Sequence, residues 1–215
     1  MTLKEALFEL INEEVLIDFD KQNNKIEITE SHEGKENYKP ENRDKFLQSV
    51  TIVGIKNEEF IIAFKPDSDN KDYKFLSGLI NDKVRNIKKS CDGIIFCKIN
   101  DQHYILAVEL KSEKPKDLNK KYKAVKLFLT FLNEILKMYY DIEEKFIIVN
   151  VLFDRNPKTG KPNFLPIPSQ REESTEIYFQ QGFKKSEGNE SRIKRILDAL
   201  NEEIKGNNDI TYLNY

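Results

Sequence analysis

The chain has 215 residues, with 35 Lys and Arg against 37 Asp and Glu and a formal net charge of −2 at pH 7. This length suits one domain with elaborations, or a core domain plus a small subdomain, and it can bury a sizeable core. The balanced charge excludes binding of nucleic acid through global basic charge, so any polyanion site must come from local clustering.

The two cysteines, Cys91 and Cys97, are six residues apart around one expected strand. They are too far apart for a disulfide across an extended segment, and they lack the neighbours of a zinc site. The chain also has no apolar stretch of membrane-spanning length, and its N-terminus has a helix pattern and not that of a signal peptide. We therefore expect a soluble cytoplasmic protein with reduced thiols and no membrane partner.

Residues 1–72 are expected to form an N-terminal elaboration made of one helix and β-hairpins. Thr2 and Glu5 have the spacing of a capping box, and apolar residues at helical spacing continue to about residue 14. This pattern predicts that the chain begins with an amphipathic helix.

Alternation of polar and apolar residues predicts two hairpins in the same region. The first pairs residues 15–20 with 25–30, and the second pairs residues 50–55 with 60–64. The polar residues 31–43 between them predict a surface loop.

A core of the α/β class is predicted for residues 73–153, from the order of its helical and strand-like patterns. Its last strand is apolar on both faces, which is typical of a sheet that is covered on both sides. We expect a central mixed sheet with the long helix on one face. In chain order the expected elements are a helix over 73–89, strands over 93–99 and 104–111, a helix over 118–140 and a strand over 146–153.

Residues 154–215 are expected to complete the same domain. The proline-containing residues 154–174 predict a long loop, and residues 176–179 predict a short strand. Residues 190–205 carry apolar side chains at helical spacing and predict a helix.

Asp92, Glu109 and Lys111 are the candidate functional residues of the core. Strand side chains alternate between faces, so Glu109 and Lys111 share one face. If the two strands pair as a hairpin, Asp92 approaches the same edge of the sheet. Two carboxylates and an ammonium would then converge, which is the chemistry that a hard cation and a polarised water require.

The same residues also allow a purely structural interpretation. In a chain that is 33% charged, Glu-x-Lys is common, and an ion pair on a solvated strand contributes little to stability. Asp92 followed by Gly93 is, by itself, typical of a turn. The expected cover on both faces of the sheet favours a functional site, because charges are costly in such a sheet.

The arrangement resembles the PD-(D/E)XK nuclease superfamily, in which an Asp on one strand and an acid-x-Lys on the next hold magnesium. The resemblance covers roughly residues 73–153, and Cys91 stands where the motif has proline. It implies a restriction-endonuclease-like core and a Mg²⁺-dependent DNA endonuclease of restriction or defence type, with Mn²⁺ able to substitute. In that mechanism Asp92, Glu109 and the Leu110 carbonyl would hold the metal, and Lys111 would stand beside the attacking water.

Members of this superfamily often add an acid from a helix that precedes the core. Asp82 and Glu9 are the candidates for that role. A local basic patch follows Lys111 and is expected to track phosphates, although a solubilising helix face is an equal alternative. The patch consists of Lys114, Lys116, Lys120, Lys121 and Lys123.

DNA is the expected partner, and a two-fold dimer would follow if each chain supplies one site for double-strand cutting. The main alternative is a catalytically inactive module that binds nucleic acid or protein on the same fold. A third interpretation is an α/β interaction protein whose charged strand face is incidental.

Overall fold

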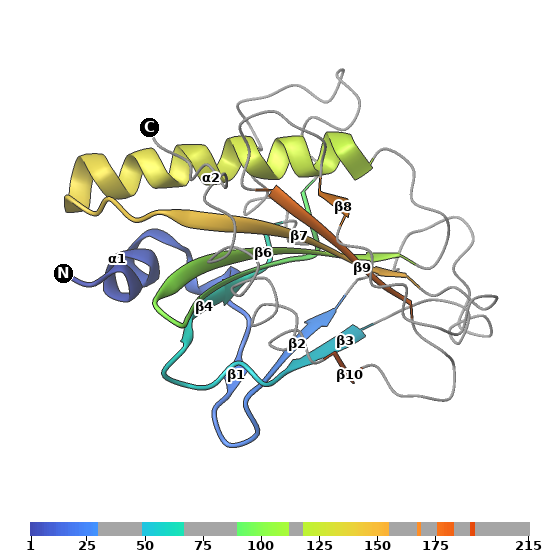
Figure 1. Cartoon of the computed structure of the whole chain (residues 1–215). Helices are drawn as coiled ribbons and strands as arrows, with labels where there is room; N and C mark the ends of the chain where they lie inside the picture. The colour runs from blue at the N-terminus through green and yellow to red at the C-terminus, as the bar shows by residue number, and fades with distance from the viewer. Residues whose placement is uncertain are drawn as a thin grey trace.

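The structure is a computed structural model that describes residues 1–29, 49–66, 90–111, 118–154, 167–168, 176–182 and 190–191. Within these residues the chain is an α/β protein with two helices and two sheets (Figure 1). The predicted loop 31–43 and the predicted helix 73–89 lie outside the described residues. The same is true of most of the predicted loop 154–174 and most of the predicted helix 190–205.

The larger sheet has six strands and contains the predicted core strands. Strands β4, β5 and β6 are antiparallel, whereas β6, β7 and β9 are parallel and β8 runs antiparallel to β9. The central mixed sheet is therefore confirmed. In spatial order the strands are β4 (Phe60–Phe64), β5 (Gly93–Ile99), β6 (Gln102–Lys111), β7 (Phe146–Asp154), β9 (Glu176–Gly182) and β8 (Ile167–Pro168).

Helix α2 (Leu118–Tyr140) connects β6 to the parallel strand β7, with the bounds that the periodicity predicted. A parallel pair requires such a crossover because the chain must return to the same end of the sheet. Val125, Leu129 and Leu132 are buried against the sheet, as expected for the apolar face of an amphipathic helix.

The smaller sheet has four strands, in the order β1 (Phe19–Asp20), β2 (Lys25–Thr29), β3 (Ser49–Val53) and β10 (Glu190–Ser191). Strands β1 and β2 form the first predicted hairpin, although β1 has only two residues. Strand β10 is parallel to β3. The first two residues of the predicted helix 190–205 are thus in a strand, and that prediction is wrong at its start.

The second predicted hairpin is also wrong, because β3 and β4 belong to different sheets. Strand β3 pairs with β2, and β4 pairs with β5. Their burial patterns give the reason. In β3 only alternate residues are fully buried, which suits a sheet covered on one face, whereas all five residues of β4 are buried. Gly54, at φ 95°, redirects the chain between the two sheets.

Helix α1 (Leu3–Leu10) has the predicted capping box, in which Thr2 and Glu5 bond each other's backbone amides. It ends before residue 14, because Asn12 caps a separate 3₁₀ turn, η1 (Glu13–Val15). Leu3, Ala6 and Leu7 of α1 are buried, and the helix contacts β4 and α2.

The larger sheet separates two hydrophobic cores. On one face, β6 contributes Ile105 and Ala107 to a core shared with α1 and α2. On the other face, Val108 and Leu110 pack in a core that includes residues of β2 and β3. Figure 1 shows α2 along one side of the sheet and β2 and β3 on the opposite side. The predicted cover on both faces is therefore confirmed.

No helix in the described part of the chain combines the length and the apolar character needed to cross a lipid bilayer.

Gly93 lies at a close contact between the two sheets and provides a test of their packing. A Cβ at this position would lie 2.7 Å from Cδ1 of the buried Ile28. We expect Gly93→Ala to lower the free energy of unfolding by about 1–3 kcal/mol, as overpacked cores do. The measurement is urea unfolding followed by circular dichroism.

Ile28→Val supplies the control for this test, because valine lacks the Cδ1 atom. Alone it should cost about 0.5–1.5 kcal/mol. Combined with Gly93→Ala, it should recover part of the loss caused by the alanine. Strict additivity of the two losses would show that the sheets do not meet at this contact.

Candidate functional site

The β5–β6 hairpin places Asp92 directly beside the strand position of Glu109. Gly93 pairs with Val108, and Asp92 and Glu109 are the next residues along the two chain segments. The Asp92 amide donates to the Val108 carbonyl at 2.9 Å, and Asp92 Oδ2 accepts from the Leu110 amide at 2.6 Å. Asp92 is thus fixed to the residues on both sides of Glu109.

Both acids are buried at this end of strands β5 and β6. Asp92 is 8% exposed and Glu109 is fully buried. Glu109 belongs to the face of β6 that carries Ile105 and Ala107, which is the face covered by α2. Burying a carboxylate without a compensating partner costs free energy, so the neighbours of Glu109 determine the cost of its burial.

Glu109 forms an ion pair with Lys121, on the first turn of α2. Lys121 Nζ lies 2.5 Å from Glu109 Oε1, and the lysine side chain is only 13% exposed. The sequence had placed Lys121 in the basic patch, and its pairing with Glu109 was missed. One signal was present: Lys121 lies four residues before Val125 and eight before Leu129, both of which are buried.

The thiol of Cys91 lies within the electrostatic range of the same charges. Burial raises its pKa, and the carboxylates of Glu109 and Asp92 raise it further, whereas Lys121 acts in the opposite direction. Asp92, Glu109 and Lys121 therefore share one environment around this buried sulfur. A thiol held in its neutral form is a poor nucleophile, so the chemistry of this region is that of its carboxylates.

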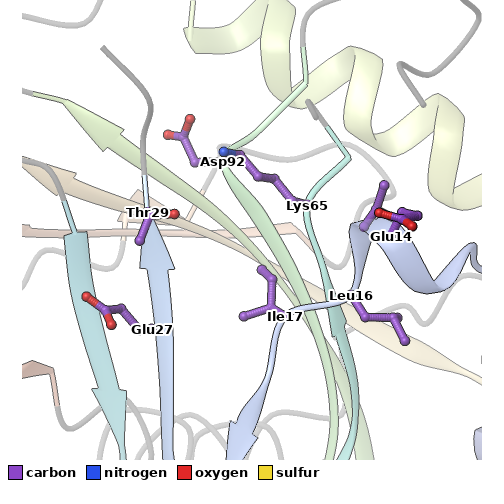
Figure 2. Close-up of a pocket in the computed structure, with 8 residues that line it drawn as sticks. Glu14, Leu16, Ile17, Glu27, Thr29, Lys65 and Asp92 are labelled. Atoms are coloured by element: carbon purple, nitrogen blue, oxygen red, sulfur yellow. The ribbon is translucent and has the colours of Figure 1, made fainter. Parts of the chain in front are cut away.

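A pocket of about 220 Å³ lies beside Asp92 (Figure 2). Lys65 extends toward Asp92 in this view, and Glu14 and Glu27 lie on opposite flanks. Glu109 is not among the described residues that line the pocket, so the pocket reaches the site from the Asp92 side. Its lining residues are Glu14, Val15, Leu16, Ile17, Glu27, Thr29, Lys65 and Asp92.

Lys111 ends strand β6, two residues after Glu109, and its backbone is in register with Asp154 of β7. Its side chain lies outside the described part of the structure. Asp82, Lys114 and Lys116 also lie outside it. The prediction that Lys111 faces the two acids stays a prediction.

Glu9 is not brought to the site. It is exposed on α1. Desolvation raises the pKa of the Tyr140 hydroxyl, and the charge of Glu9 raises it further. Tyr140 ends α2 at the opposite end from Lys121, about 28 Å away at 1.5 Å per residue. The physical reason is that α1 packs beside β4 and α2, and the charge of Glu9 acts on Tyr140 at the far end of α2 from Lys121.

Lys120 and Lys123 are exposed on the first turns of α2, as the helical spacing predicted. Lys121 differs from them because its ammonium is directed into the site. Within the described patch, therefore, Lys120 and Lys123 are the lysines that present charge to solvent.

The donor atoms of Asp92 and Glu109 suit a hard cation. Among the described residues, no group of three or more His, Cys, Asp or Glu side chains is placed to hold a metal ion. Mg²⁺ commonly binds through one or two carboxylates and keeps several waters, whereas a dedicated protein cage supplies more ligands. Two carboxylates at a sheet edge fit the first pattern.

No protein-family model, curated protein or solved structure matches the chain.

The Glu109–Lys121 pair should contribute unequally to stability when either partner is changed. Lys121→Met leaves a fully buried carboxylate and should lower the free energy of unfolding by about 3–5 kcal/mol. Glu109→Gln should cost less, because the lysine stem can carry its ammonium toward water. The double variant should lose less free energy of unfolding than the sum of the two single losses. Urea unfolding of all four proteins measures this coupling, and its absence would mean that the two side chains do not interact in solution.

Proposed function

We propose that this protein is a metal-dependent nuclease that hydrolyses phosphodiester bonds, with DNA as the favoured substrate. The observation that carries the proposal is the adjacent placement of two buried acids, Asp92 and Glu109, where strand β5 begins and strand β6 ends. Acids that are costly to bury are retained in such a position when they perform a chemical task.

The order of elements supports the same proposal. The β5–β6 hairpin, the crossover helix α2 and the parallel strand β7 form the arrangement expected for a restriction-endonuclease-like core. The end of β6, which carries Glu109 and Lys111, lies beside the end of β7. Open α/β sheets bind their ligands outside the carboxyl ends of parallel strands.

Asp92 and Glu109, with the Leu110 carbonyl, would hold Mg²⁺, and Mn²⁺ would substitute for it. When bound, such an ion supplies a polarised water and stabilises negative charge on the phosphate. The chain itself fixes Asp92 through its hydrogen bonds to the backbone of Val108 and Leu110. Lys111 would stand beside the attacking water and stabilise charge on the scissile group.

Positive charge for the substrate would come from the start of α2. Lys120 and Lys123 are exposed there, on the helix that covers Glu109. Phosphate contacts of this type position a nucleic acid without reading its sequence. They also explain how a chain with a net charge of −2 could bind a polyanion.

Asp92→Asn and Glu109→Gln should abolish cleavage, because each removes a negative oxygen ligand while keeping the shape of the side chain. Lys111→Ala should also abolish cleavage but largely spare metal binding, since lysine acts on the water and not on the ion. The assay incubates plasmid DNA, single-stranded DNA and RNA with Mg²⁺, Mn²⁺ or a chelator.

Glu134→Gln is the matched control for the activity assay, because it makes the same chemical change at an exposed position of α2. It should leave the cleavage rate unchanged. If purified, folded Glu109→Gln protein cleaves as fast as the unsubstituted chain, the activity has another source. The alternative function is then a catalytically inactive binding module, which the pairing of Glu109 with Lys121 would suit.

The basic patch can be tested through the salt dependence of binding. Replacing both Lys120 and Lys123 by Ala should weaken nucleic-acid binding and reduce the slope of log K against log salt by about 1–2, since each phosphate contact contributes about 0.7–0.9. Fluorescence anisotropy with a labelled duplex and a labelled single strand measures this. Lys137→Ala, at the far end of α2, should leave the slope unchanged. An equal effect of all three lysines would indicate binding by diffuse charge alone.

A further inference from the structure

The buried ion pair between Lys121 and Glu109 ties helix α2 to the strand that carries the site. Its two charged atoms are 2.5 Å apart, and neither side chain is well exposed. The carboxylate in this pair is one of the two acids proposed to hold a metal ion. The same carboxylate is therefore sought by two cations, and one of them, the Lys121 ammonium, belongs to the protein and contacts Oε1.

We infer that Lys121 is a built-in counter-ion that competes with the divalent cation for Glu109. This inference rests on the proposed metal site. An ammonium beside Glu109 raises the energy of a second cation at the same carboxylate through direct repulsion, and a low local dielectric strengthens that repulsion. Metal binding and the Lys121–Glu109 contact are consequently alternatives, and each weakens the other.

The position of Lys121 allows it to give way. It lies near the start of α2, where the side chain is 13% exposed, so its four-carbon stem can carry the ammonium into solvent. Glu109 has no such freedom, because it is fully buried in the middle layer of the fold. Of the two partners, Lys121 is therefore the one that moves when a metal ion takes its place.

The pair also explains how the site tolerates its acids without metal. Beyond the effect of burial, the charges of Glu109 and Asp92 both raise the pKa of the Cys91 thiol, and the charge of Lys121 lowers it. One ammonium compensates part of the negative charge of two carboxylates. Removing Lys121 takes this compensation away, which should favour an added divalent cation.

The test is Mn²⁺ binding, measured by electron paramagnetic resonance of the free ion. Lys121→Met should bind Mn²⁺ about tenfold more tightly than the unsubstituted protein, within the usual range of site-to-site coupling. Lys137→Met is the matched control. Lys137 lies on the same helix, and its ammonium pairs with Glu143 at the surface. Lys137→Met should not change the affinity for Mn²⁺. Asp92→Asn should lower that affinity both in the unsubstituted protein and in Lys121→Met.

A second measurement uses the unsubstituted chain and does not depend on the folding of Lys121→Met. Amine acetylation followed by peptide mass spectrometry should show that Mn²⁺ increases the modification of Lys121 and leaves that of Lys137 unchanged. Unaltered or reduced modification of Lys121 at saturating Mn²⁺ would overturn the inference.

The outcomes separate this inference from the proposed function. Cleavage and Mn²⁺ binding by the unsubstituted protein, with the same affinity in Lys121→Met, would overturn the competition and leave the nuclease proposal standing. Binding only by Lys121→Met would support the competition and count against a metal enzyme in the natural chain. Binding by neither protein would overturn both.

Discussion

A sheet covered on both faces leaves a charged side chain without access to bulk water, and this constraint governs the whole site. Glu109 lies in such a sheet, with α2 on its own face and the smaller sheet behind it. The fold tolerates the charge because Lys121, in the first turn of α2, reaches the carboxylate. Packing and electrostatics are thus inseparable here: the helix that buries Glu109 also supplies its counter-ion.

Local periodicity predicted the elements whose burial is strongest. Helix α2 and strands β5, β6 and β7 agree with their expected ranges within two residues, because long amphipathic and continuous apolar patterns leave few alternatives. The separation of β3 from β4 could not be predicted in this way. Their lengths and composition suit a hairpin, and the choice of partner depends on which sheet needs a fully buried strand. Strand β10 has only two residues and carries no pattern of its own.

The candidate site was predictable in part. Alternation along β6 and the β5–β6 pairing place Asp92 next to Glu109, and both follow from the sequence. Lys121 was not recognised as a partner, because the angle at which a crossover helix lies on its sheet is not encoded in the helix pattern. The available signal was its position at the border of the apolar stripe. A lysine at such a border can direct its ammonium either toward the sheet or toward solvent.

The way in which the two sheets share the chain limits how the protein can be divided into fragments. Strand β4 precedes residue 73 but forms the edge of the larger sheet, and β10 comes from the C-terminal part but extends the smaller one. A fragment of residues 73–153 would lose β4 and expose the backbone groups of β5, an edge prone to pairing with other molecules. Removal of the residues after 182 would likewise uncover β3. The segment with the candidate site therefore depends on its N- and C-terminal neighbours for strand partners, and cutting at the boundaries that the sequence suggests would remove those partners.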